Sequence, residues 1–223
     1  MKGPAARVLR SIVRRKDKKK NRQILARLGG DIRRCVKCPL HKSRRQAVPG
    51  EGCSHARILF IGEAPGKLED QQGRPFCGRA GQFLDRLLDG SGLKRSEVFI
   101  TSSVKCRPRN NRLPRSDELQ TCYSYWLRRQ IEIIDPKVIV LLGKIPVWQL
   151  LRVNRSLKEL HGRFYRNADR LYQVQYHPAA GMRFPNLGAA MGGILKSSEG
   201  SATRRGGEGD VRPMMARQAD VSR

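Results

Sequence analysis

Apolar residues occur along this chain as short uninterrupted runs separated by longer amphipathic stretches. Consecutive branched and aromatic side chains are typical of strands that are buried on both faces of a sheet. Three such runs and one alternating run predict four strands, over residues 57–61, 98–100, 138–142 and 171–176. A glycine or a polar residue follows each run, so polar loops are expected at the carboxyl ends of the strands.

Helical spacing of apolar residues separates these strands. It predicts helices over residues 24–34, 82–89, 116–134, 143–151 and 186–195. Ser116 marks one helix start, because a hydroxyl cap followed by Asp117 and Glu118 satisfies free amides and the helix dipole. Strands that alternate with helices predict an α/β domain with a parallel sheet covered on both faces. The loops that follow Ile61, Ile100 and Tyr176 would then lie along one edge of that sheet.

The charge of the chain is extreme. Its 223 residues carry a formal net charge of +27, and the first 50 residues contain 17 Lys and Arg against two Asp. Such a field favours a polyanionic partner, most plausibly nucleic acid. We expect residues 1–24 to be a flexible basic arm, residues 25–195 to be the folded domain, and residues 196–223 to be a disordered tail rich in Gly, Ser and Arg.

No stretch resembles a signal peptide or a membrane span, so we expect a cytoplasmic protein. In a reducing compartment the six cysteines are more plausible as ligands or core residues than as disulfides. A pair in a turn, a third cysteine past a strand and a fourth on a helix could meet at one corner, namely Cys35, Cys38, Cys106 and Cys122. Four thiolates suit zinc or a [4Fe-4S] cluster. The spacing is not that of a zinc ribbon, which favours the cluster; four separate buried thiols are the alternative.

The stretch from residue 62 to residue 85 is the candidate ligand loop, since open α/β sheets bind ligands at the carboxyl ends of their strands. It contains one acid, Glu63, directly after the strand, and one aromatic residue in a glycine-rich turn, Phe76, which could stack on a flat base. His177 precedes a proline near the end of the last strand and could donate a hydrogen bond to a developing anion. Basic residues on or near the same loops are candidate phosphate contacts: Arg74, Arg79, Lys105, Arg107 and Arg112.

Several motifs in order resemble the family 4 uracil-DNA glycosylases, the iron–sulfur type found in bacteria and archaea. The matching residues are Cys35-x-x-Cys38-Pro39-Leu40, the stretch RILFIGEAPG from residue 57, Glu69-Asp70, the stretch GRPFCGRAG from residue 73, Val104-Lys105-Cys106-Arg107-Pro108, Asn111-Arg112 and Tyr176-His177-Pro178-Ala179-Ala180. Cys122 stands where the last cluster ligand of the family is expected. The resemblance covers about residues 33–195.

This resemblance implies a three-layer α/β/α fold with a central, mostly parallel sheet. It implies hydrolysis of the N-glycosidic bond of deoxyuridine in DNA, which releases uracil and leaves an abasic site for base excision repair. The four cysteines named above would hold a structural [4Fe-4S] cluster. The partner would be uracil-containing DNA, single- or double-stranded, bound by a monomer in a prokaryotic nucleoid.

The resemblance also implies roles for the residues of the ligand loop. Gly62, Glu63 and Ala64 would line a uracil pocket, Phe76 would stack on the flipped base, and His177 would bond to a uracil oxygen. We assign Glu63 and His177 as catalytic, with Glu63 positioning the attacking water or stabilising the developing charge on the sugar.

One position departs from the family pattern. The family has an asparagine that reads the polar edge of uracil, and this chain has Ser102 there, with one hydroxyl in place of a paired donor and acceptor. Two alternatives therefore stand beside uracil excision. One is a glycosylase with an altered base preference, and the other is a protein that keeps the fold and only binds DNA.

Overall fold

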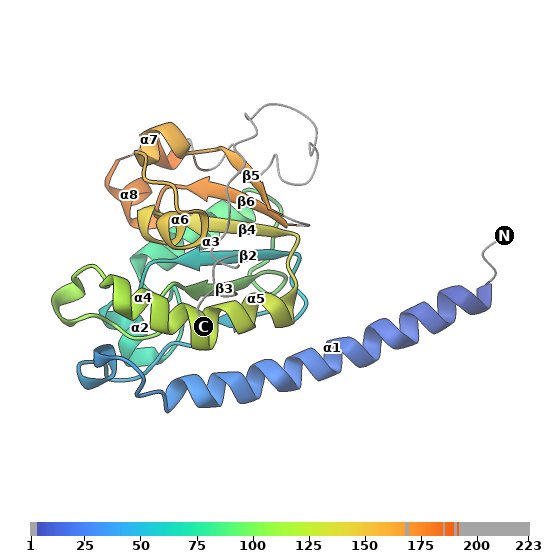
Figure 1. Ribbon diagram of the computed structural model, residues 1–223. Coiled ribbons are helices and arrows are strands. Elements are labelled where there is room, and N and C mark those ends of the chain that lie inside the picture. Colours follow the sequence, from blue (N-terminus) through green and yellow to red (C-terminus); the bar gives the residue numbers. More distant parts are fainter. Residues whose placement is uncertain (1–3, 168–169, 185, 190, 192–223) are drawn as a thin grey trace, which may run out of the picture.

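The computed structural model describes residues 4–167, 170–184, 186–189 and 191 (Figure 1). In this part of the chain six strands form one sheet in the order β1-β3-β2-β4-β6-β5. Their bounds are β1 (Glu51–Gly52), β2 (Ile58–Gly62), β3 (Phe99–Ser102), β4 (Val138–Leu142), β5 (Phe164–Asn167) and β6 (Arg170–Gln175). Strands β3, β2, β4 and β6 are parallel, which confirms the four predicted strands.

The two edge strands are antiparallel and were not predicted. β1 has only two residues, and β5 has the sequence FYRN, which contains neither an apolar run nor a clear alternation. Their pairing depends on the neighbouring strand rather than on their own sequence.

Helices cover both faces of the sheet (Figure 1). They are α2 (Lys67–Gln72), α3 (Arg79–Asp89), α4 (Ser116–Cys122), α5 (Arg128–Ile134), α6 (Lys144–Leu151), α7 (Leu157–Leu160) and α8 (Pro178–Arg183), with 3-10 turns at η1 (Pro39–Lys42) and η2 (Arg109–Asn111). A π-helical segment, η3 (Tyr123–Leu127), joins α4 to α5, so the helix predicted over 116–134 is present with one widened turn. The predicted hydroxyl cap is wrong: Ser116 is already the first helical residue, and the carboxylate of Glu118 accepts a hydrogen bond from the amide of Arg115 instead.

Alternate residues of the central strands supply two separate cores. Leu59 and Leu141 point into a cluster with α5 and α6, whereas Phe60 and Val140 point into a second cluster with α3. This division follows from the period of two in a strand, since successive side chains lie on opposite faces. The expected three-layer α/β/α fold is therefore confirmed.

The first helix is longer than the sequence indicates. α1 (Pro4–Arg33) is one continuous helix, whereas the prediction began a helix at Ile24. Lys and Arg have nearly the helix propensity of Leu, so a run poor in apolar residues can still be helical. α1 contacts α5, where the Asn21 side-chain amide donates to the backbone oxygen of Ile133 at 2.8 Å.

The predicted closing helix over 186–195 lies partly outside the described residues, of which 186–189 and 191 are helical. The predicted tail over 196–223 lies wholly outside them. Within the described part of the chain, no helix combines the length and the apolar character needed to span a membrane.

Candidate functional site

The loops after β2, β3 and β6 meet at the carboxyl edge of the sheet, as predicted. They enclose a cavity of about 410 Å³ whose lining includes Ala64, Phe76, Ser102 and His177. The parallel register places the end of β2 beside the end of β3, with Gly62 opposite Ser102. Four of the predicted pocket residues therefore line one cavity, although four separate segments of the chain supply them.

Phe76 is held in an unusual conformation. Its φ of 47° lies in the left-handed region, which costs a residue with a side chain about 1–2 kcal/mol. Its ring covers Gly62, where an added Cβ would lie 2.7 Å from Cζ of the ring, and its carbonyl oxygen occupies the position that a Cβ on Gly81 would need. The two glycines therefore fix the height of the aromatic ring in the cavity wall. The ring lies 5.7 Å from the ring of His177.

His177 is the N-cap of α8, and its Nδ1 accepts a hydrogen bond from the amide of Ala179 at 3.2 Å. A neutral ring that accepts at Nδ1 carries its proton on Nε2. Burial lowers the pKa of His177 to about 4. Near neutral pH this residue is therefore an uncharged donor at the edge of the cavity.

Glu63 lies beside the cavity and not in its lining. Its side chain is half-buried, and desolvation raises the pKa of its carboxyl group. The carbonyl oxygens of Gly62 and Glu63 accept hydrogen bonds from the amides of Ser103 and Val104, which join the two loops. Gly62 and Glu63, which were predicted to line the pocket, therefore lie beside the cavity, where their backbone carbonyl groups join the loops after β2 and β3.

Lys105 is not available to hold a phosphate. Its side chain is 1% exposed, and its ammonium group donates to Thr101 Oγ1 at 2.6 Å and to the carbonyl oxygen of Ser102 at 2.7 Å. The prediction of a DNA contact at Lys105 is therefore wrong. A lysine stem is long enough to turn back onto the end of its own strand, and here the ammonium group holds the backbone of Ser102.

The other predicted phosphate contacts differ in what they already bind. Arg74 pairs with Glu51 at 2.9 Å, and Arg112 donates to both carboxylate oxygens of the buried Glu118 at 2.6 and 2.8 Å. Arg107 donates to the side chain of Asn111. Arg79 is exposed and lines the cavity.

Two residues that position the loops were missed by the sequence analysis. Arg95 binds Glu51 and Asp85 and donates to the carbonyl oxygen of Pro75 at 2.7 Å, so it holds the loop before the aromatic ring. Asp70 is buried, and its carboxylate accepts hydrogen bonds from the amides of Arg45 and Gln46. Nothing in the sequence around Arg95 indicates its role. The Glu69-Asp70 pair was noted as a motif, but the sequence analysis assigned no function to Asp70.

The four predicted ligand cysteines line one small cavity of about 10 Å³. Cys35 and Cys38 lie between α1 and η1, Cys106 follows β3, and Cys122 ends α4 just before the π segment. Leu40 and Trp126 complete an apolar wall. Within the described residues no group of three or more His, Cys, Asp or Glu side chains has the arrangement to hold a metal ion.

Three of these sulfur atoms accept N–H hydrogen bonds. Arg44 donates to Cys106 Sγ at 2.9 Å, Trp126 Nε1 to Cys35 Sγ at 3.2 Å, and the amide of Lys105 to Cys122 Sγ at 3.3 Å. Burial raises the pKa of Cys106 to about 11 and that of Cys122 to about 12. Donors aimed at sulfur stabilise a thiolate, so they oppose the effect of burial.

Comparison with known proteins identifies the class that this fold and cavity define. A model described as the Uracil DNA glycosylase superfamily matches residues 49–194. The chain is 45% identical to the type-4 uracil-DNA glycosylase of Pyrobaculum aerophilum (70% of this chain, 83% of the relative). It is 46% identical to that of Saccharolobus solfataricus (72% and 78%). The type-5 enzyme of Pyrobaculum aerophilum is only 29% identical (65% and 78%). This chain belongs to the type-4 uracil-DNA glycosylases.

Proposed function

We propose that this chain hydrolyses the N-glycosidic bond of deoxyuridine in DNA, releasing uracil and leaving an abasic site. The observation that supports this most directly is the cavity lined by an aromatic ring, a hydroxyl and a neutral imidazole donor from Phe76, Ser102 and His177. Its volume of about 410 Å³ exceeds what one pyrimidine ring needs and leaves room for the attached sugar.

The base must leave the duplex to reach this cavity, which costs a few kcal/mol. Phe76 offers its ring to the extruded base, and stacking of a base on an aromatic side chain is worth about 1–3 kcal/mol. The strained backbone of Phe76 is fixed before the base arrives, so the stacking surface needs no rearrangement.

His177 stabilises the leaving group. As the glycosidic bond breaks, negative charge develops on the base, and the Nε2 proton of His177 is directed by the hydrogen bond at Nδ1. Because the ring is uncharged, it donates this hydrogen bond without transferring its proton. Glu63 orients the attacking water or stabilises the positive charge that develops on the sugar.

Base release from U:G, U:A and single-stranded oligonucleotides tests this function. His177→Gln should lower the single-turnover rate by about 10²–10³-fold, the effect of removing one donor to a developing anion. Lys158→Gln, an exposed change on α7, serves as the control and should keep the wild-type rate. Absence of abasic product from all three substrates with folded wild-type protein would refute the proposal.

We further propose that Cys35, Cys38, Cys106 and Cys122 hold a [4Fe-4S] cluster. The donor set fits: four thiols line one apolar cavity, and N–H donors reach three of the sulfur atoms. The spacing of the four cysteines along the chain is not that of a zinc ribbon, which favours the cluster over a single zinc ion. When bound, the cluster would crosslink four segments of the chain.

The cluster proposal is tested on protein purified without oxygen. Iron and sulfide should be present at four of each per chain, with a broad absorption band in the visible range. Cys122→Ser should lose this absorption and lower the melting temperature. Cys53→Ser, a change of a cysteine outside the four, should retain both. Zinc in place of iron in the anaerobic wild-type protein would contradict the proposal.

Ser102 favours a second candidate, a glycosylase with a shifted base preference. A serine hydroxyl cannot make the paired contacts of an asparagine amide, so the pocket should discriminate less against other deaminated pyrimidine or purine bases. A panel of oligonucleotides that each carry one damaged base separates the two candidates by their relative kcat/KM values.

For the partner, we propose uracil-containing DNA, single- or double-stranded, held near the cavity by Arg79 and Arg107. The enzyme would act as a monomer in the nucleoid, and sedimentation should then give a mass near 25.3 kDa. Arg79→Gln should weaken binding of an abasic duplex. It should also reduce the slope of log K against log salt for that binding by about 0.9, the effect of losing one phosphate contact.

A further inference from the structure

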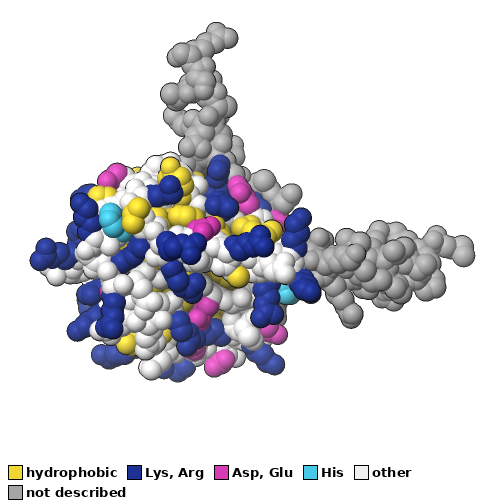
Figure 2. Space-filling model, turned by 90° about the horizontal axis from the view of Figure 1, so that it is seen from below, with side chains coloured by type: hydrophobic (Ala, Val, Ile, Leu, Met, Phe, Trp, Pro, Cys, Tyr) yellow, Lys and Arg dark blue, Asp and Glu magenta, His cyan; other side chains and the backbone are white. Residues whose placement is uncertain are grey.

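Several of the basic residues that are exposed and outside ion pairs lie away from the cavity. Arg74, Arg95 and Arg112 are each paired with an acidic residue. On α1, the exposed basic side chains that take part in no ion pair among the residues whose side chains are described include Lys18, Lys19, Lys20 and Arg22. Figure 2 views the molecule from the side of α1 and shows many more Lys and Arg than Asp and Glu side chains.

The body of the domain holds this part of α1 in place. Leu28 and Ile32 are buried in the core cluster around the cysteines, and Leu25 packs against two clusters. Together with the hydrogen bond from Asn21 to Ile133, these contacts fix the axis of the helix. The sequence of α1 contains eleven Lys and Arg against two Asp. The basic side chains from Lys18 to Arg22 therefore belong to a fixed surface of the domain.

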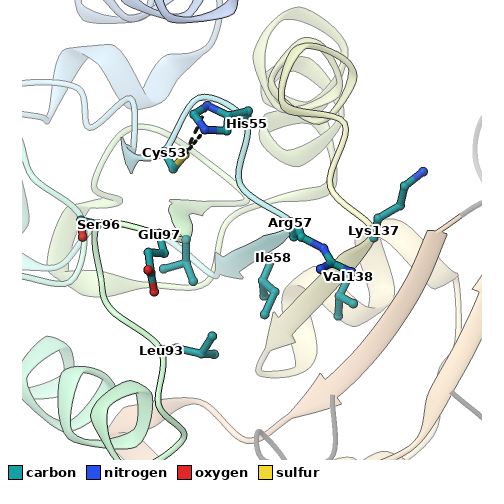
Figure 3. Close-up of a pocket in the computed structure, with 10 residues that line it drawn as sticks. Cys53, His55, Arg57, Ile58, Leu93, Ser96, Glu97, Lys137 and Val138 are labelled. Carbon is teal, nitrogen blue, oxygen red and sulfur yellow. Dashed lines mark hydrogen bonds between the residues drawn. The ribbon is translucent and has the colours of Figure 1, made fainter. Parts of the chain in front are cut away.

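A second hollow, of about 640 Å³, extends this surface (Figure 3). Arg57 and Lys137 lie together on one side of the hollow, across from Glu97 (Figure 3). Neither cation takes part in an ion pair among the described side chains. His55 lines the same hollow, and Lys18 of α1 is close enough to contribute to the lowering of its pKa, after the larger effect of burial. The hollow and the basic part of α1 are thus adjacent.

This surface lies at the edge of the sheet opposite to the base-binding cavity. Arg57 precedes β2 and Lys137 precedes β4, whereas the cavity lies after the carboxyl ends of β2, β3 and β6. Strands of four to six residues separate the two edges by about 15–20 Å. The cations of the opposite edge therefore lie on a different side of the domain from the cavity.

We propose that Lys18, Lys19, Lys20 and Arg22 of α1, with Arg57 and Lys137, form a second DNA-binding surface that holds a different duplex segment from the one in the base-binding cavity. Phosphates are the ligand, since unpaired cations on a fixed helix bind a regular polyanion without reading its sequence. This inference rests on the proposed function in one respect, namely that a damaged base of the first duplex occupies the cavity. Its consequence is that one enzyme molecule can bridge two segments of DNA.

The test uses the full chain, a donor-labelled abasic duplex for the cavity and an acceptor-labelled undamaged duplex. Wild-type protein should give energy transfer between the two duplexes. The triple variant Lys18→Gln/Lys19→Gln/Lys20→Gln should lose it, and Arg57→Gln/Lys137→Gln should reduce it. The matched control is Lys158→Gln/Arg163→Gln/Arg166→Gln, which removes three exposed charges from α7, β5 and the turn between them and should retain the signal.

Salt dependence gives an independent measure. For the undamaged duplex, loss of three phosphate contacts should reduce the slope of log K against log salt by up to about 2.7 in the α1 variant. An equal reduction in the control would show a general charge effect and overturn the proposal. Base release from a short oligonucleotide separates this result from the catalytic proposal. A loss of rate confined to the α1 variant would place α1 on the lesion duplex and also overturn it.

Discussion

We expect Ser102 to decide how well the pocket discriminates between bases, and replacing it with asparagine tests this directly. Ser102 is 5% exposed and lines the cavity, and its carbonyl oxygen is held by the Lys105 ammonium group at 2.7 Å. The backbone is therefore anchored independently of the side chain, and Ser102→Asn changes only what projects toward the base. The cavity of about 410 Å³ can accept the larger amide.

The expected magnitude follows from the paired hydrogen bond that an asparagine amide would form with the base edge. Such a pair is worth about 1–3 kcal/mol of discrimination. Since about 1.36 kcal/mol corresponds to a tenfold change in rate, Ser102→Asn should raise kcat/KM for uracil by about 5- to 150-fold. Activity on other damaged bases should rise less or fall. Ser102→Ala, which removes the hydroxyl, should instead lower the rate on uracil.

The assay is single-turnover release of base from oligonucleotides that carry one lesion each, with melting temperature and visible absorption recorded for each variant. If Ser102→Asn and Ser102→Ala both fold, keep their absorption and retain the wild-type rate on every base, position 102 does not contact the base. That result would refute the role given to this residue here.

Three further changes test other parts of the site. Gly62→Ala should lower base release by about 10²-fold, because its Cβ would lie 2.7 Å from the Phe76 ring and displace it; single-turnover kinetics measure this. The rate should show no inflection near pH 6.5, since burial lowers the pKa of His177 to about 4 and keeps its ring neutral; an inflection near pH 6.5 that His177→Gln removes would contradict this. Glu118→Gln should destabilise the fold by about 1–3 kcal/mol, measured by urea unfolding. Because the pKa of Glu118 is lowered in the folded state, its stabilising effect should be present above pH 4.5 and be lost at lower pH.

The sheet and the position of the site could be predicted because both depend on local pattern. The runs around Leu59 and Val140 are apolar without interruption, which fixes them as central strands. Once the strands are parallel, the residues that follow them must meet at one edge. Glu63, Ser102 and His177 were therefore placed at the same edge without any knowledge of their side-chain partners.

Side-chain direction could not be predicted in the same way. Lys105 follows a strand in a basic segment, which indicated an exposed contact, but its ammonium group turns back to Thr101 and Ser102. The positive φ of Phe76 likewise could not be predicted, because phenylalanine has no preference for the left-handed region. Gly81 is the indirect sign, because the carbonyl of Phe76 occupies the place of any side chain there.

The distribution of charge shows most clearly that side-chain partners cannot be predicted from the sequence. A net charge of +27 predicts a polyanion but gives no indication of which cations are neutralised within the fold. Long-range ion pairs decide this: Glu51 is 23 residues from Arg74 and 44 from Arg95 along the chain, and it pairs with both beside the loop of the base-binding cavity. Salt bridges at that edge leave the unpaired cations of α1 to dominate the opposite edge. This distribution is what the proposed second DNA-binding surface requires, and it leaves uncharged groups, Phe76, Ser102 and the neutral His177, among those that line the cavity.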